Sequence, residues 1–314
     1  MSKEKIVIAL GGNALQTAGM PPTAECQLEV VKKTCEYIAK IVENDYQIAL
    51  VHGNGPQVGR ILLAFETAKD VTPPMPFDVC GAMSQGYIGY HLQQGMHQAL
   101  MKINRDISVL TVVTQMVVDK NDPGFNNPTK PIGPFYSEEE AKKIAEEKNY
   151  VMKEDAGRGW RRVVASPIPQ KIVEIDTIKS LWGSAIVVSS GGGGIPVIEN
   201  EDGTYEGIEA VIDKDYAAEL LAEQVEADKL LILTEVEKVS LNYNKPDQVD
   251  LDKLTVAEAE RYIAENHFAP GSMLPKVKAA VKFAKSGEGK TAVITSLYKA
   301  IEALEGKTGT HITA

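Results

Sequence analysis

Three short apolar runs in this sequence each lead directly into a cluster of glycines. The runs and their clusters are residues 6–10 with Gly11 and Gly12, residues 47–51 with Gly53 and Gly55, and residues 185–189 with the glycines at 191–194. Short β-branched runs are typical of buried parallel strands, and an open parallel sheet binds ligands at the carboxyl ends of its strands. The first glycine pair alone is equally consistent with a tight turn. Together, the three clusters predict one ligand site at one edge of a sheet.

Such loops are suited to bind an anion through the backbone. Glycine lets backbone N–H groups approach a ligand closely, and a helix that follows the loop adds the positive end of its dipole. A phosphate can therefore be bound there without a basic side chain.

Strand and helix patterns alternate along most of the chain. Strand-like runs occur at 5–10, 47–51, 109–113, 185–189, 229–234 and 291–295, and helical periodicity occurs at 29–42, 57–68, 80–103, 216–225, 257–266 and 274–285. This order is typical of βαβ units, which build a parallel sheet with helices on both faces. The 314 residues, 44% of them hydrophobic, are enough for one large α/β unit or two lobes.

Residues 119–169 interrupt this alternation. Six prolines surround one charged helical segment at 137–148, and the basic residues Lys130, Arg158, Arg161 and Arg162 gather here. Long proline-rich insertions in a compact domain are usually functional, so we expect a protruding subdomain that acts as a lid. The prolines at 128 and 131 restrict the backbone around Lys130, which argues against a freely solvated loop lysine.

Composition and spacing disfavour several classes of function. The net charge of −10 argues against nucleic acid and anionic membranes as partners. No apolar run or leader pattern indicates membrane insertion or export, so a cytoplasmic protein is expected. Cys26, Cys35 and Cys80 form no C-x-x-C pair and are interpreted as reduced thiols, and the histidines lack the spacing of a zinc site. Neither a P-loop nor a G-x-G-x-x-G fingerprint is present.

Two lysines supply the cations that the glycine loops lack. Lys214 lies between Asp213 and Asp215 just before a predicted helix, and Lys276 lies in the first turn of another. A lysine there opposes the helix dipole unless an anion sits beside it. Phosphoryl transfer needs cations and N–H donors around the transferred group, which is what two lysines and three glycine loops offer. Asp215 could hold both ammonium groups in position, or it could be only a helix cap.

Several strings resemble those of the carbamate kinases in the amino acid kinase family, and the resemblance extends along essentially the whole chain. They are the strings at 9–15, 52–59, 157–167, 191–197, 211–215, 233–236 and 271–276. Many relatives in the wider family carry a lysine just before the first glycine pair, where this chain has Ala9 and Leu10. The resemblance assigns the vacated contact with the substrate phosphate to Lys130.

The resemblance implies an α/β fold, a three-layer αβα open sandwich around a mainly parallel eight-stranded sheet with a protruding subdomain. It implies one domain over 1–314, in which 1–184, including the lid at 119–169, binds carbamoyl phosphate, and 185–314 binds the nucleotide. The implied reaction is the reversible transfer of a phosphoryl group between carbamoyl phosphate and ADP, which gives ATP and carbamate. Mg²⁺ would travel on the nucleotide phosphates with no metal ligands from the protein, and the enzyme would be a homodimer.

The resemblance also assigns roles to single residues. The catalytic residues would be Lys214, Lys276, Asp215 and Lys130. The substrate would lie against Gly11, Gly12, Asn13, Gly53, Asn54 and Gly55. The nucleotide would contact Lys214, Thr234, Glu235, Val236, Ser272, Met273 and Lys276.

Two other functions remain open at this point. A related kinase acting on a carboxylate such as acetylglutamate or aspartate would share the loops and lysines, but would be expected to keep the early lysine and to lack the proline-rich insertion. A non-catalytic nucleotide-sensing module could lose Lys214 or Lys276 without penalty. The sequence leaves open the roles of Arg158, Arg161 and Arg162, the dimer interface, the physiological direction and the pathway, of which arginine breakdown is one.

Overall fold

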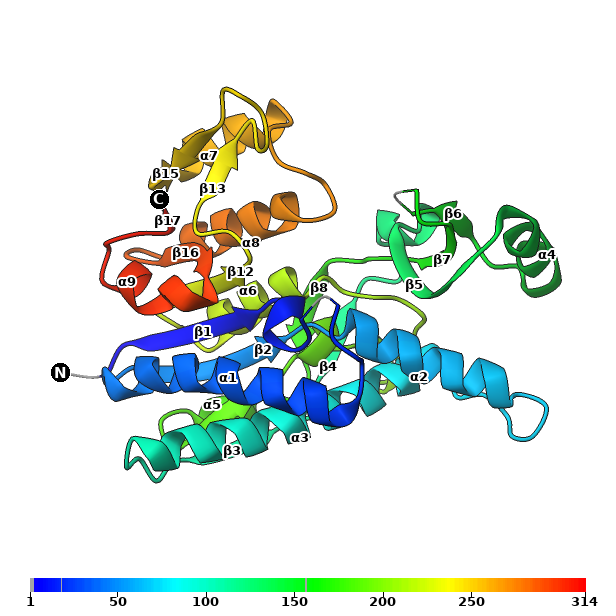
Figure 1. The fold of residues 1–314 in the computed structure, drawn as a ribbon, viewed down its shortest axis with the longest axis horizontal. Coiled ribbons are helices and arrows are strands. Elements are labelled where there is room, and N and C mark those ends of the chain that lie inside the picture. Colours follow the sequence, from blue (N-terminus) through cyan, green and yellow to red (C-terminus); the bar gives the residue numbers. More distant parts are fainter. Residues whose placement is uncertain (1–2, 18, 156) are drawn as a thin grey trace.

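The computed structural model describes residues 3–17, 19–155 and 157–314. A central sheet with helices on both faces dominates this part of the chain (Figure 1). In spatial order its eight strands are β15 (Lys253–Thr255), β17 (Thr310–Thr313), β16 (Thr291–Ser296), β12 (Lys229–Thr234), β1 (Lys5–Leu10), β2 (Gln47–His52), β9 (Ala185–Val188) and β3 (Ser108–Thr111). All neighbours pair in parallel except β16 and β17. The predicted fold class is confirmed.

Strand β1 shows why the sequence builds three layers. Its side chains alternate between the two faces: Ile6, Ile8 and Leu10 pack into one core, and Val7 and Ala9 into the other. The first core is covered by α1 (Ala24–Glu43), α3 (Phe77–Lys102) and α9 (Ala300–Leu304); the second by α5 (Ile175–Leu181), α6 (Lys214–Gln224), α7 (Val256–Ala264) and α8 (Met273–Lys285). Because both faces are buried, a continuous apolar run is what the strand needs.

A second sheet was not predicted. The strand expected at 109–113 ends at Thr111, and beyond it the backbone N–H of Thr114 donates to the Gln85 side chain at 2.8 Å. The chain then enters a four-stranded sheet with the order β11 (Tyr205–Gly207), β10 (Ile195–Glu199), β4 (Gln115–Val118) and β8 (Pro169–Ile172).

The expected insertion forms a lobe that stands away from the central sheet (Figure 1). It contains α4 (Glu138–Lys148), which is capped by Ser137 and Glu140 as a capping box, and an antiparallel sheet with the order β5 (Lys130–Tyr136), β7 (Trp160–Val164) and β6 (Met152–Glu154). The helix was predicted, but the strands were not. Two prolines in β5 hide its strand pattern, and they are tolerated because β5 lies at the edge of this sheet.

The remaining elements are α2 (Gly55–Ala68), the hairpin of β13 (Val239–Leu241) with β14 (Val249–Leu251), and the 3₁₀ turns η1 (Gly12–Ala14), η2 (Pro123–Asn126), η3 (Gly191–Gly193) and η4 (Leu297–Lys299). In the described residues, no helix combines the length and apolar character needed to span a bilayer. The two proposed halves share one sheet, in which β9 from the second half lies between β2 and β3 of the first. A division at residue 184 therefore does not separate two folding units.

Candidate active site

The three glycine loops meet at the carboxyl ends of neighbouring strands β1, β2 and β9. The backbone N–H of Gly53 donates to the carbonyl of Leu10 at 3.3 Å. Gly192, with a φ of +65°, lies so close to the second loop that an added Cβ would be 2.1 Å from Nδ2 of Asn54. A side chain at this position would therefore push two loops apart. The structure brings together the loops that the sequence predicted to form one site.

Hydrogen bonds from two side chains hold these loops against α3. Gln85 on α3 donates through Nε2 to the carbonyl of Gly191 at 3.0 Å, and Asn54 donates to the hydroxyl of Ser84 on the same helix at 2.9 Å. His52 is fully buried, and burial lowers its pKa to about 4, so its ring is neutral at physiological pH. Sequence analysis missed Gln85, because the glycine loop that its side chain binds lies more than 100 residues away in the sequence.

Asp215 bridges the two lysines that the sequence singled out. Its Oδ1 accepts from Nζ of Lys214 at 2.5 Å, and its Oδ2 accepts from Nζ of Lys276 at 2.8 Å. The side chain of Asp215 is 3% exposed and each lysine side chain is 14% exposed. Burial opposes ionisation of Asp215, but the two ammonium groups outweigh it and lower its pKa to about 2. Burial also lowers the pKa of Lys214.

The helix boundary corrects one detail of the sequence interpretation. Lys214 and Asp215 do not precede the helix, because α6 begins at Lys214 and Asp213 is its N-cap. The Asp213 side chain accepts from the backbone N–H of Asp215 at 3.0 Å. The helix-capping role that was considered for Asp215 therefore belongs to Asp213. Both carboxylate oxygens of Asp215 face lysines.

Helices α6 and α8 both direct their N-termini towards this cluster, since Lys214 opens α6 and Lys276 lies in the first turn of α8. A second ion pair joins the same helices further along, where Nζ of Lys282 lies 2.6 Å from Glu219. Glu219 is fully buried, and burial raises its pKa to about 7. The positive ends of two helix dipoles are thus held beside the lysines, an arrangement that favours a bound anion.

Lys130 reaches the cluster from the lid. It is the first residue of β5, and its Nζ lies 2.5 Å from Oδ2 of Asp213. A freely solvated loop lysine is therefore excluded for this conformation. Sequence analysis did not identify Asp213 as the ion-pair partner of Lys130, because the two residues are 83 positions apart in the sequence.

The charges of this cluster do not cancel. Among the described residues, Lys130, Lys214 and Lys276 form ion pairs only with Asp213 and Asp215, which leaves one net positive charge beside two helix N-termini. The Lys214 side chain also packs on the second glycine loop, where a Cβ added to Gly53 would lie 3.4 Å from its Cδ. The lysines and the amide-rich loop therefore border the same space, which is suited to a phosphate.

The residues assigned to the nucleotide fall into two groups. Thr234 ends β12 and Glu235 and Val236 follow it, and Nδ2 of Asn13 donates to Oε1 of Glu235. Ser272 is the N-cap residue of α8 and Met273 its first residue, three positions before Lys276. The first group thus borders the first glycine loop, and the second group borders the cation cluster. Their contacts with a nucleotide stay predictions.

The three arginines of the lid divide into two kinds. Arg158 and Arg161 both bind Asp155 at 3.1 Å and lie over the ring of Phe135, so they stabilise the lid itself. Arg162 instead pairs with Glu209 outside the lid and stacks on Tyr150. All three arginines are therefore engaged in ion pairs in this structure.

Within the described ranges, no group of three or more histidine, cysteine, aspartate or glutamate side chains is arranged to hold a metal ion. The carboxylates nearest the cluster, Asp213 and Asp215, are engaged by lysines.

Comparison with known proteins agrees with this chemistry. Residues 4–296 match the amino acid kinase family. The carbamate kinase of Clostridium perfringens is 55% identical and the carbamate kinase of Pyrococcus horikoshii 54% identical, with 98% and 99% of this chain and 99% of each relative covered. The structure of carbamate kinase from Giardia lamblia bound to AMP-PNP has a TM-score of 0.93 at 45% identity and covers 100% of this chain and 99% of that one.

Proposed function

Because this chain belongs to the amino acid kinase family, we propose that the Lys214–Asp215–Lys276 cluster and the glycine loops form the phosphoryl-transfer centre of a carbamate kinase. The enzyme transfers a phosphoryl group reversibly between carbamoyl phosphate and ADP, which gives ATP and carbamate. One observation carries the proposal. Asp215 holds both ammonium groups, at 2.5 and 2.8 Å, where the glycine loops meet.

The protein has little covalent chemistry to perform in this reaction. A terminal oxygen of ADP attacks the phosphorus of carbamoyl phosphate, the bond from phosphorus to the carbamate oxygen breaks, and carbamate leaves with the electron pair. Charge spreads over the three equatorial oxygens in the transition state. Lys214 and Lys276 would neutralise that charge, and the backbone amides at Gly11, Gly12 and Gly53 would donate to the oxygens. Asp215 keeps both lysines in place before the substrates arrive.

The nucleotide would bind on the side of β12 and α8, against Thr234, Glu235, Val236, Ser272 and Met273. Carbamoyl phosphate would bind on the side of η1 and α2, against Asn13, Asn54 and Gly55. Mg²⁺ would enter as part of the metal–nucleotide substrate. Carbamoyl phosphate is a mixed anhydride, so ATP formation is the downhill direction. We place the enzyme in the cytoplasm, where ADP is available and its three free thiols stay reduced.

A substrate panel tests the proposed specificity against the related carboxylate kinases. The purified protein is incubated with MgATP and either carbamate, N-acetylglutamate or aspartate, and ADP release is measured. We expect ADP release only in the sample that contains carbamate. Equal or faster release with either amino acid substrate would overturn the assignment and favour a carboxylate kinase.

Lys130 is expected to act on carbamoyl phosphate and not on ADP. Its Nζ is held by Asp213 in this structure, one residue from the catalytic lysine Lys214, so a small movement would carry it to the substrate phosphate. Lys130→Ala should raise the KM for carbamoyl phosphate by about tenfold and leave the KM for ADP within about twofold. Steady-state kinetics with each substrate varied in turn measures both, and an equal rise in the two KM values would instead indicate a general defect in lid closure.

We propose that the homodimer forms through the outer face of α3. Val79, Met83, Tyr90 and Met101 are exposed and recur at helical spacing along this face, with exposures of 37–57%. A row of exposed apolar side chains along one face of a helix is typical of an interface.

Met83→Glu and Tyr90→Glu should each convert the dimer to a monomer. In a symmetric interface, the new carboxylate would be buried away from water and would face the same carboxylate of the partner subunit. Val249→Glu, at a similarly exposed apolar residue on β14, is the control and should leave the dimer intact. Sedimentation velocity distinguishes the two masses. Dimers that persist in both α3 variants would show that the interface lies elsewhere.

A further inference from the structure

The segment that leads into the catalytic helix α6 is attached to the lid at three places. Glu209 forms an ion pair with Arg162, the backbone N–H of Val211 donates to the carbonyl of Ala165 at 2.9 Å, and Asp213 binds Nζ of Lys130 at 2.5 Å. These contacts recur at every second residue of the segment, the spacing of an extended chain. The segment 209–213 therefore runs along the base of the lid like an added strand.

On the side of the lid, Arg162 and Lys130 are structurally linked. Ile132 pairs with Arg162 and Lys130 with Val164 in the antiparallel ladder of β5 and β7. Paired residues share a face of a sheet, and so do residues two apart in one strand. Arg162 and Lys130 therefore project from the same face of one hairpin, and both reach the segment 209–213.

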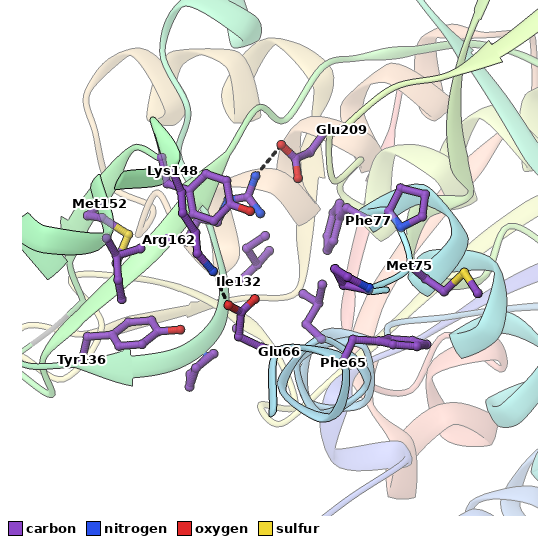
Figure 2. A pocket seen from close by; sticks show the side chains of 17 residues that line it. Phe65, Glu66, Met75, Phe77, Ile132, Tyr136, Lys148, Met152, Arg162 and Glu209 are labelled. Carbon is purple, nitrogen blue, oxygen red and sulfur yellow. Dashed lines mark hydrogen bonds and ion pairs between the residues drawn. The ribbon is translucent and has the colours of Figure 1, made fainter. Parts of the chain in front are cut away.

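The lid packs against the body through an apolar cluster at its base, where Ile132 and Val164 meet Val58, Phe77 and Cys80. Beside this cluster, a cavity of about 300 Å³ lies between the lid, α2 and the loop before α3, with Phe65, Met75 and Phe77 on one wall and Tyr136 and Met152 on the other (Figure 2). Two ion pairs border this cavity, Arg162 with Glu209 and Lys148 with Glu66. Because the cavity supplies no packing contacts, these ion pairs add to the apolar cluster in holding the lid against the body.

The Arg162 pair is better placed than its neighbour to set the position of Lys130. The guanidinium carbon of Arg162 lies 3.4 Å from the centre of the Tyr150 ring, and its side chain is 16% exposed, so its orientation is well defined. Glu209 lies only four residues before Asp213. The pair of Lys148 and Glu66 instead joins the ends of α4 and α2.

We propose that Arg162 and Glu209 are positioning residues that fix the base of the lid against the segment 209–213, so that Lys130 meets the phosphate of carbamoyl phosphate. This inference rests on the proposed function and adds a specificity device to it. Neither residue touches the reacting atoms. Their effect is transmitted through the β5–β7 hairpin to a lysine that does.

Arg162→Gln and Glu209→Gln test the inference, with Arg161→Gln as the matched control. Arg161 is the preceding residue of β7, is similarly buried at 18% exposure, and binds Asp155 within the lid. We expect each of the first two variants to raise the KM for carbamoyl phosphate by about tenfold, with the KM for ADP unchanged within about twofold. The double variant should be no worse than either single variant, because both remove the same contact. Arg161→Gln should leave both KM values unchanged.

Equal rises in the two KM values, additive losses in the double variant, or the same kinetics in Arg161→Gln would each overturn the inference. Glu209 is about half exposed, so Glu209→Gln remains informative if Arg162→Gln does not fold. Amide hydrogen exchange at Val211 gives a readout apart from activity and should become faster in both pair variants. Failure of the proposed function itself is distinguishable, since the wild-type enzyme would then form no ATP from carbamoyl phosphate.

Discussion

Alanine at Lys214 or at Lys276 should lower kcat for ATP formation by about 10²–10³ with only a modest change in either KM. Each lysine is 14% exposed and held by Asp215 beside the glycine loops, where a cation stabilises charge that grows in the transition state. An interaction that strengthens only in the transition state appears in kcat and not in KM. Initial rates with both substrates saturating measure the loss.

Lys278→Ala is the control for this prediction. Lys278 lies on α8 two residues after Lys276 but is exposed, so its removal alters the charge of the protein by the same amount at a distance from the cluster. We expect normal kinetics in this variant. A comparable loss of kcat at Lys278, or a loss at Lys214 and Lys276 confined to KM, would mean that the lysines act through general electrostatics or substrate binding.

Asp215→Asn should have a comparable effect on kcat, about 10²-fold or more, although Asp215 itself would not contact the phosphoryl group. The substitution keeps the shape of the side chain but removes the charge that holds two ammonium groups together. Lys214 and Lys276 would then repel each other in a site that is largely shielded from water. Because Asp215 acts through the lysines, Asp215→Asn combined with Lys276→Ala should lose less activity than the product of the single losses.

A double-mutant cycle with thermal unfolding of each variant distinguishes this role from simple stabilisation. Asp213→Asn is the matched comparison for thermal unfolding. Asparagine remains a good N-cap, so the thermal stability of this variant should stay close to that of the wild-type protein. Independent, multiplicative losses at Asp215 and Lys276 would contradict the bridging role. So would a fall in thermal stability at Asp215 with kcat intact.

Local patterns made six of the eight strands of the central sheet predictable, but not the short strands β15 and β17. The run at 6–10 predicts a strand with both faces buried, and the glycines that follow it predict the ligand-binding edge of the sheet. Fewer than about ten consecutive residues are enough for both predictions. The strands of the lid and of the second sheet were missed. They are three to seven residues long, and Pro131 and Pro134 interrupt β5.

Contacts between residues far apart in the sequence limited how much of the site could be predicted. Lys276 could be identified because it lies in the first turn of a predicted helix, where a lysine is unfavourable without an anion. Lys214 could be identified because it lies between two aspartates just before another predicted helix. The pairing of Asp213 with Lys130 and of Glu209 with Arg162 depends on how the lid folds back across the segment 209–213. No local spacing encodes that contact, so the role of the lid arginines became visible only in the structure.

Direct detection of ATP is the measurement closest to the central claim. Purified protein is mixed with ADP, Mg²⁺ and carbamoyl phosphate, and ATP is followed by a coupled luminescent assay, with Lys276→Ala prepared in parallel. We expect rapid ATP formation by the wild-type enzyme and a rate about 10²–10³ lower in the variant. ATP at only the uncatalysed background in the wild-type sample, or equal rates in the two proteins, would contradict the assignment of this site as a carbamate kinase centre.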